Sequence, residues 1–96
     1  MGSPAVRFHP RAADEADTAH LWYQARNSHV AEAFRADLDA ALGAITEGAR
    51  RWMRLFVRFR RLPLRRFPFS VVYVERTEAI DVIAIAHHRR RPGFWT

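Results

Sequence analysis

Two neighbouring apolar segments near the C-terminus constrain the fold more than any other part of this 96-residue chain. Residues 69–74 and 80–86 are rich in β-branched and aromatic side chains, and in each segment both alternating faces are mostly apolar. The residues between them, Glu75-Arg76-Thr77-Glu78, have the composition of a turn. A strand that is apolar on both faces is normally covered on both, so the two segments are predicted to be adjacent central strands of a sheet.

Two shorter strands are predicted elsewhere. Val6 and Phe8 alternate with polar residues, which indicates a strand that stops at Pro10. Leu62 and Leu64 indicate another strand, with Phe67 as its far limit. Pro63 places this strand at an edge of the sheet, because proline has no N–H to donate to a neighbour.

Helical periodicity occupies the region between the first two strands. The spacing predicts one helix from Pro10 to about Ala25 and a second from Ser28 to Gly48, with Ser28 as its N-cap. The two apolar stripes are Ala12, Ala16, Ala19 and Tyr23, then Val30, Phe34, Leu38, Ala41 and Ile45. So short a connection implies an antiparallel helix hairpin.

These elements predict one α+β domain, spanning residues 1–96, with the order β-α-α-β-β-β. If the hairpin returns the chain to the end where the first strand stopped, strand 4 runs opposite to strand 1. The expected sheet is therefore all antiparallel, in the order 1-4-3-2, with the helix hairpin packed on one face. The other face is expected to expose apolar side chains unless a partner covers it.

Charge divides the chain into two unequal halves. Residues 1–49 contain four arginines and seven acidic residues, a net charge of −3, whereas residues 50–96 contain twelve arginines and three acidic residues, a net charge of +9. Every cationic residue other than histidine is arginine, whose planar guanidinium suits phosphate and carboxylate groups. A scattered, solvated basic surface is the simpler interpretation for any single arginine. For the whole set, the segregation favours an anionic partner.

Several classes of function are not supported. The chain has no cysteine, which excludes disulfides and thiolate chemistry. His87 and His88 are neighbours on a strand and must point to opposite faces, so no metal site is expected, and no Gly-rich loop or Ser-His-Asp pattern implies a cofactor or a conventional hydrolase. No apolar run approaches the ~20 residues of a membrane span, and residues 1–10 lack a signal-peptide core, so a cytoplasmic protein without membrane contact is expected.

The candidate functional residues lie around the second and fourth strands. Arg61, Arg65 and Arg66 accompany the second strand, and the fourth strand runs directly into a cluster of imidazole, guanidinium and aromatic groups. This cluster comprises His87, His88, Arg89, Arg90, Arg91, Phe94 and Trp95. If the third strand lies between the other two, both groups of arginines flank a common surface. His87 or His88 is a candidate general acid or base, and an ordinary edge histidine is the alternative.

Four motifs together resemble the RelE/ParE superfamily of toxins from type II toxin–antitoxin systems, and the resemblance covers nearly the whole chain from Val6. They are Phe8-His9-Pro10, Trp22-Tyr23, Arg66-Phe67-Pro68-Phe69-Ser70-Val71-Val72-Tyr73, and residues 83–95. The resemblance implies a cytoplasmic growth inhibitor of the plasmid-stabilisation kind, which an acidic cognate antitoxin binds in a hetero-oligomer. It also implies one of two targets: DNA gyrase for ParE-like members, or mRNA on the ribosome for RelE-like members.

The residues that match the RelE pattern favour the ParE-like alternative. The strand-3 arginine of RelE-like nucleases corresponds to Ser70, and their strand-2 lysines fall near Arg61 and Pro63. Their strand-4 arginine matches Arg89, and their C-terminal tyrosine falls near Phe94 or Trp95.

Gyrase poisoning is therefore the leading hypothesis, with Arg61, Arg89, Arg90, Arg91, Phe94 and Trp95 binding the target. The alternative is a metal-independent mRNA interferase that uses Arg65, Arg66, His87, His88 and Arg89. A third alternative is a basic binding module without toxicity.

Overall fold

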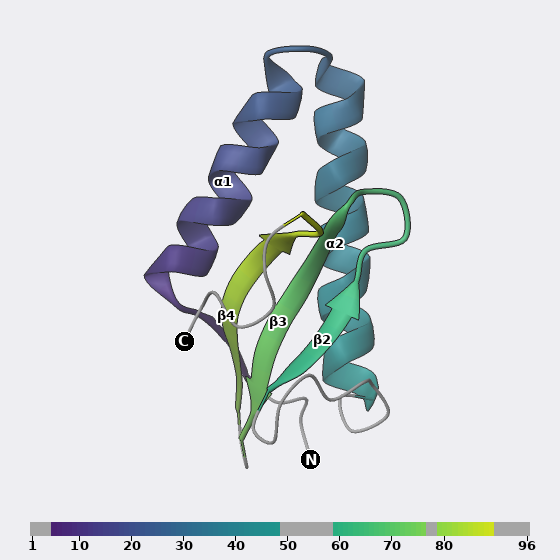
Figure 1. Ribbon diagram of the computed structural model, residues 1–96. Helices are drawn as coiled ribbons and strands as arrows, with labels where there is room; N and C mark the ends of the chain where they lie inside the picture. Colours follow the sequence, from purple (N-terminus) through teal and green to yellow (C-terminus); the bar gives the residue numbers. More distant parts are fainter. Residues whose placement is uncertain (1–4, 49–58, 77–78, 90–96) are drawn as a thin grey trace.

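The computed structural model describes residues 5–48, 59–76 and 79–89. Its elements follow the predicted order: β1 (Ala5–Phe8), α1 (Pro10–Gln24), α2 (Ser28–Gly48), β2 (Arg60–Pro63), β3 (Phe69–Glu75) and β4 (Ala79–His87). They form a four-stranded sheet in the order β1-β4-β3-β2, as predicted. Both helices lie on one side of this sheet and rise beyond its upper end (Figure 1).

The direction of one strand pair differs from the prediction. β1 and β4 are parallel, with Ala5 opposite Ala79 and Phe8 opposite Val82, so the sheet is mixed rather than all antiparallel. The cause is the unequal length of the helices. α1 has 15 residues and α2 has 21, and at about 1.5 Å per residue α2 runs roughly 9 Å further. It therefore carries the chain past the end of β1 to the opposite end of the sheet, where β2 begins (Figure 1).

The core lies between the helix hairpin and the inner face of the sheet. The predicted stripes are buried, apart from partly exposed Ala16 and Tyr23 and from Val30, which is exposed near the hairpin tip. An aromatic cluster joins the layers: the Tyr23 ring lies 5.4 Å from Phe34 and 5.0 Å from Phe67, and Phe34 lies 5.5 Å from Phe69. Such tilted and edge-to-face pairs stabilise the packing beyond the area that they bury.

A β-bulge decides which face the end of β4 presents. Tyr73 of β3 pairs with Val82, whereas its neighbour Val72 pairs with Ala84, so Ile83 is an extra residue in β4. The alternation of side chains therefore reverses at this point. As a result, both Val82 and Ile85 face the helices and belong to the main core.

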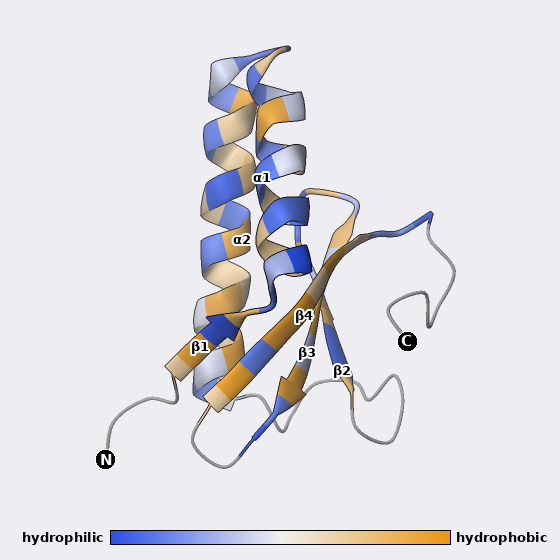
Figure 2. Cartoon of the chain, turned by 90° about the vertical axis from the view of Figure 1, so that its left-hand side faces the viewer, coloured by the Kyte–Doolittle hydropathy of each residue, from blue (hydrophilic) through white to orange (hydrophobic). Residues whose placement is uncertain are grey.

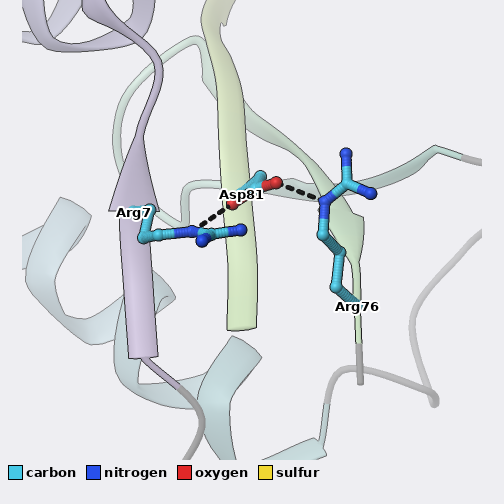
Figure 3. A network of polar contacts seen from close by, with 3 residues as sticks. All are labelled: Arg7, Arg76 and Asp81. Carbon is cyan, nitrogen blue, oxygen red and sulfur yellow. Dashed lines mark hydrogen bonds and ion pairs between the residues drawn. The ribbon is translucent and has the colours of Figure 1, made fainter. Parts of the chain in front are cut away.

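The face of the sheet opposite the helices is not an open apolar surface, contrary to the expectation from the sequence. Val72 and Ala84 are fully buried there, Ala86 is nearly so, and Phe59 packs against them. Nearer the start of β4 the same face carries an ionic network (Figure 3). Asp81 accepts a hydrogen bond of 2.8 Å from Arg7 Nε of β1 and another from Arg76 Nε. In Figure 2, a hydrophilic band interrupts the mostly hydrophobic β4.

The helix ends follow ordinary capping chemistry. α1 begins at Pro10, as predicted, and the His9 ring accepts a hydrogen bond from the Arg11 N–H. At α2 the capping residue is Asn27 rather than Ser28: its side-chain oxygen accepts from the N–H groups of His29 at 2.9 Å and Val30 at 3.4 Å. The side-chain oxygen of Asn27, one residue before Ser28, therefore satisfies two backbone N–H groups in the first turn of the helix. Neither helix in the described part of the chain has the length and apolarity needed to cross a membrane.

Candidate functional site at the basic end of the sheet

β2 ends, β3 begins and β4 ends at the same end of the sheet. Ser70 of β3 is the central position there, since it pairs with Pro63 of β2 on one side and with Ala86 of β4 on the other. The loop between β2 and β3 is joined to the end of β4 by a 2.9 Å hydrogen bond from His88 N to Pro68 O. We refer to five residues as the basic end: Arg61, Arg65, Arg66, His88 and Arg89.

A buried hydroxyl group links the two sides of the basic end. Ser70 is only 1% exposed. Its Oγ accepts a 3.0 Å hydrogen bond from Arg61 Nε and lies 3.0 Å from His88 Nε2. Because arginine can only donate, the hydroxyl hydrogen of Ser70 remains available for His88 Nε2. Ser70 Oγ is therefore in contact with one group from β2 and one from the end of β4.

Asp37 of α2 holds the loop that carries Arg65 and Arg66. Its buried carboxylate accepts hydrogen bonds from the backbone N–H of Arg66 at 2.8 Å and of Arg65 at 3.3 Å. The carboxylate of Asp37 therefore binds the backbone of the loop from its inner side and not the guanidinium groups, while the side chains of Arg65 and Arg66 are exposed. The loop geometry thus depends on a helix residue 28 positions earlier in the chain.

The cations of the basic end differ from the other sheet arginines in how they are neutralised. Arg7 and Arg76 pair with Asp81, and Arg60 pairs with Glu75 at 3.4 Å. Within the part of the chain that the structure describes, Arg61, Arg65, Arg66 and Arg89 form no ion pair. Several guanidinium groups without carboxylate partners at one end of a sheet produce a local positive potential that attracts anionic groups.

The two adjacent histidines have different surroundings, as predicted from strand alternation. His87 faces the helices, where its ring packs edge-on against Phe69 at 5.0 Å and lines a cleft beside α1. His88 faces the opposite side and contacts Ser70. The structure therefore groups His88, but not His87, with the arginines. The predicted binding residues Arg90, Arg91, Phe94 and Trp95 lie outside the described residues.

Two residues of this site were missed by sequence reasoning. Ser70 was considered only for the arginine that it replaces, although a lone serine within a central apolar strand indicates a buried hydroxyl that requires partners. Asp37 lies at helical spacing between Phe34 and Ala41, inside the apolar stripe of α2. An acidic residue at such a position is a signal that it binds something in the core.

The arrangement suits binding of an anionic surface by several arginines and one exposed imidazole. Among residues 5–48, 59–76 and 79–89, no group of three or more histidine or acidic side chains is placed to hold a metal ion.

A helix hairpin on one face of a four-stranded mixed sheet, with a cationic cluster where β2 and β4 end, defines a small α+β protein of a known class. Residues 6–92 match the family described as ParE toxin of type II toxin-antitoxin system, parDE. The chain therefore belongs to the ParE toxin family, within the RelE/ParE superfamily that the motifs indicated.

The fold is also similar to that of a solved structure of the chromosomal ParDE TA system from P. aeruginosa. The similarity has a TM-score of 0.75 at 18% sequence identity, and it covers 88% of this chain and 96% of the other. No match is found among curated proteins.

Proposed function

We propose that this chain is a growth-inhibiting toxin that acts on DNA gyrase in the cytoplasm. We further propose that a cognate antitoxin neutralises it by forming a toxin–antitoxin hetero-oligomer. Membership of the ParE toxin family supports the toxin class, and the similarity to a ParDE TA system supports an antitoxin partner. The basic end supplies the surface with which the toxin would bind its target.

The observation that carries the choice of target is the burial of Ser70 at the start of β3. Cleavage of a phosphodiester by a protein without a metal requires several fixed cations around the developing negative charge. The central strand of the basic end supplies a hydroxyl group there instead of a cation, and that hydroxyl is occupied by Arg61 and His88. Binding is therefore better supported than catalysis.

One observation favours the second candidate function, a metal-independent mRNA interferase. His88 is exposed and hydrogen-bonded to Ser70, within the same network as Arg61 and beside Arg89. An imidazole next to guanidinium groups is a usable combination of general acid–base and electrostatic stabiliser. Arg65 and Arg66 would add further cations from the neighbouring loop.

Expression of the chain alone, in cells that lack its antitoxin, distinguishes the candidates. Growth arrest with an SOS response and gyrase-linked DNA breaks is the expected result. Arrest with cleaved transcripts and halted translation would instead identify an interferase, and unimpaired growth would indicate a basic binding module without toxicity.

Replacement of Arg89, Arg90 and Arg91 by alanine tests the surface itself. The triple variant is expected to fold normally and to lose toxicity. A matched control removes three arginines from the helices, Arg11, Arg26 and Arg35, and is expected to keep toxicity with the same change in net charge. Toxicity that survives the replacement of Arg89, Arg90 and Arg91 would remove these three arginines from the mechanism.

A further inference from the structure

β4 has an edge that β1 covers only in part. The parallel pairing with β1 ends at Val82, where His9 N donates to Val82 O at 2.8 Å. β4 continues to His87, and among the described residues no strand pairs with it on this side beyond Val82. The N–H of Ile85 points toward this edge, where it donates to Glu15 Oε1 of α1 at 3.0 Å. By strand alternation, the backbone N–H and C=O of His87 point the same way.

A cleft of about 470 Å³ lies along this uncovered edge, between α1 and the end of β4. Its lining includes the apolar side chains of Trp22, Tyr23, Phe69 and Ile85. This volume lies within the range in which proteins bind small ligands. The cleft therefore combines an apolar lining with edge-facing backbone groups that a second strand could pair with, namely the C=O of Ile85 and the N–H and C=O of His87, whereas the N–H of Ile85 is already bonded to Glu15.

Trp22 forms the outer wall of the cleft and is 52% exposed, which is unusual for so large an apolar side chain. Its ring is nevertheless held in place. It packs edge-on against Tyr23 at 5.1 Å, and the Arg26 guanidinium stacks over it at 3.5 Å while donating to the Trp22 carbonyl. An exposed but positioned tryptophan is typical of the energetic centre of a protein interface.

The charge of the cleft is opposite to that of the molecule. Among the described residues that line it, Asp14 and Glu15 carry the full charges, and Arg26 lies just outside, over the Trp22 ring; the whole chain, in contrast, has a net charge of +6. Asp14 is exposed, and it enters no ion pair within the described part of the chain. A basic side chain of a bound segment would therefore be attracted to Asp14 in this cleft, whereas the arginine-rich end of the sheet would repel it.

We propose that this cleft binds an extended segment of another polypeptide, which adds to the β4 edge beyond β1. Such a segment places an apolar side chain between Trp22 and Ile85 and a lysine or arginine opposite Asp14. Strand addition supplies affinity through backbone hydrogen bonds, and the pockets for alternate side chains supply specificity. The proposal does not depend on growth inhibition or on its target.

Trp22 provides a local probe for the test. The chain has three tryptophans, so full-length protein with Trp52→Phe and Trp95→Phe reports only on the cleft. This variant is titrated with a short capped peptide of alternating valine and arginine, and with the same peptide carrying glutamate in place of arginine. Saturable change of Trp22 emission is expected only with the arginine peptide, although the protein and that peptide are both cationic.

Two variants and one modified peptide separate the contributions. Asp14→Asn is expected to weaken binding at least roughly threefold, as for a partly exposed ion pair. The matched control, Asp39→Asn on the exposed side of α2, is expected to leave it unchanged. Methylation of alternate backbone nitrogens of the peptide, which prevents strand pairing, is expected to abolish binding.

Three results would overturn the proposal. The first is an equal Trp22 response to the glutamate peptide, and the second is undiminished binding of the N-methylated peptide. The third is sedimentation showing that the chain self-associates through this cleft, with dimers lost in Trp22→Ala, which would assign the surface to a second copy instead.

Discussion

At the scale of single residues, the basic end is organised by two buried groups that are not themselves cationic. The Ser70 hydroxyl joins Arg61 of β2 to His88 at the end of β4, and the Asp37 carboxylate holds the backbone of the loop between β2 and β3. Both groups are buried. They fix the framework from which the exposed arginines project, so their loss should change local geometry before it changes the charge of the surface.

Replacement of Ser70 by alanine should break the link between Arg61 and His88. Removing one partner of a largely buried hydrogen-bonded pair costs about 1 kcal/mol in the free energy of unfolding. We also expect the His88 ring to lose its hydrogen bond to Ser70, and a change in the ring ¹⁵N chemical shifts of His88 would report this loss. Ser28→Ala, at an exposed serine of α2, is the control and should change neither quantity. An unaltered His88 spectrum in Ser70→Ala would contradict this role.

Replacement of Asp37 by alanine should release the loop that carries Arg65 and Arg66. Two backbone N–H groups lose a charged acceptor, and a cost of about 2 kcal/mol in the free energy of unfolding is expected. Urea denaturation measures it, and hydrogen exchange at the amides of Arg65 and Arg66 should accelerate. Asp39→Ala removes an exposed carboxylate two residues away and should stay within about 0.5 kcal/mol of the parent protein. Similar effects of the two substitutions would argue against the proposed anchoring.

At the scale of elements, the short β1 strand is attached to the sheet by more than its backbone. Asp81 of β4 receives hydrogen bonds from Arg7 of β1 and from Arg76 just after β3, so one carboxylate joins three segments across the face opposite the helices (Figure 3). The hydrogen bonds from Arg7 and Arg76 lower the pKa of Asp81 below its usual value of 3.8. The network therefore contributes stability only while Asp81 is ionised.

Acid denaturation should reveal this network. Between the lowered pKa of Asp81 and 3.8, the unfolded state binds more protons than the folded state. Stability contributed by Asp81 is thus fully present above this interval and is lost as the pH falls through it. The Asp81→Asn variant should show a flatter dependence of unfolding free energy on pH below 3.8, and Arg7→Ala combined with Arg76→Ala should flatten it similarly. A parental slope in Asp81→Asn would exclude the carboxylate as the titrating group.

At the scale of the whole molecule, charge and apolar surface are separated in space. The arginines of the basic end, which form no ion pair within the described residues, lie at the end of the sheet where β2 and β4 end. The acidic lining of the α1–β4 cleft contains none of them. The proposed target surface and the proposed cleft would therefore recognise partners of opposite charge. For an acidic antitoxin, long-range attraction to the basic end would mainly accelerate the encounter.

Association kinetics with the cognate antitoxin test this separation. The association rate should fall as salt is raised, since screening shortens the range of attraction to about 8 Å at physiological ionic strength. The dissociation rate should change much less. Stopped-flow measurements on the parent protein and on the Arg89, Arg90 and Arg91 alanine variant should show a weaker salt dependence for the variant. Parallel salt curves for the two proteins would place the steering charge elsewhere.

The sequence predicted the elements and their order in the sheet because periodicity and turn residues are local signals. The predicted antiparallel direction of β4 relative to β1 was wrong, because this direction depends on how far α2 extends beyond α1. The prediction of an exposed apolar face was wrong for a related reason. The burial of Val72 and Ala84 depends on contacts between residues that are distant in the chain. At the site, arginine positions could be read from the sequence, but the contacts of Ser70 and Asp37 could not. Hydrogen bonds between distant segments leave only a weak trace, such as a polar residue inside an apolar stripe.

The extra residue in β4 has a further consequence for the end of the sheet. Because strand side chains alternate with a period of two, loss of the bulge, with Ile83 paired opposite Val72, would exchange the faces of every residue that follows it. The chain has two histidines in succession at that point, so either frame would deliver one imidazole to the Ser70 side and one to the helix side. The adjacent pair thus makes the chemistry at the sheet terminus tolerant of a slip that would be disruptive elsewhere in the strand.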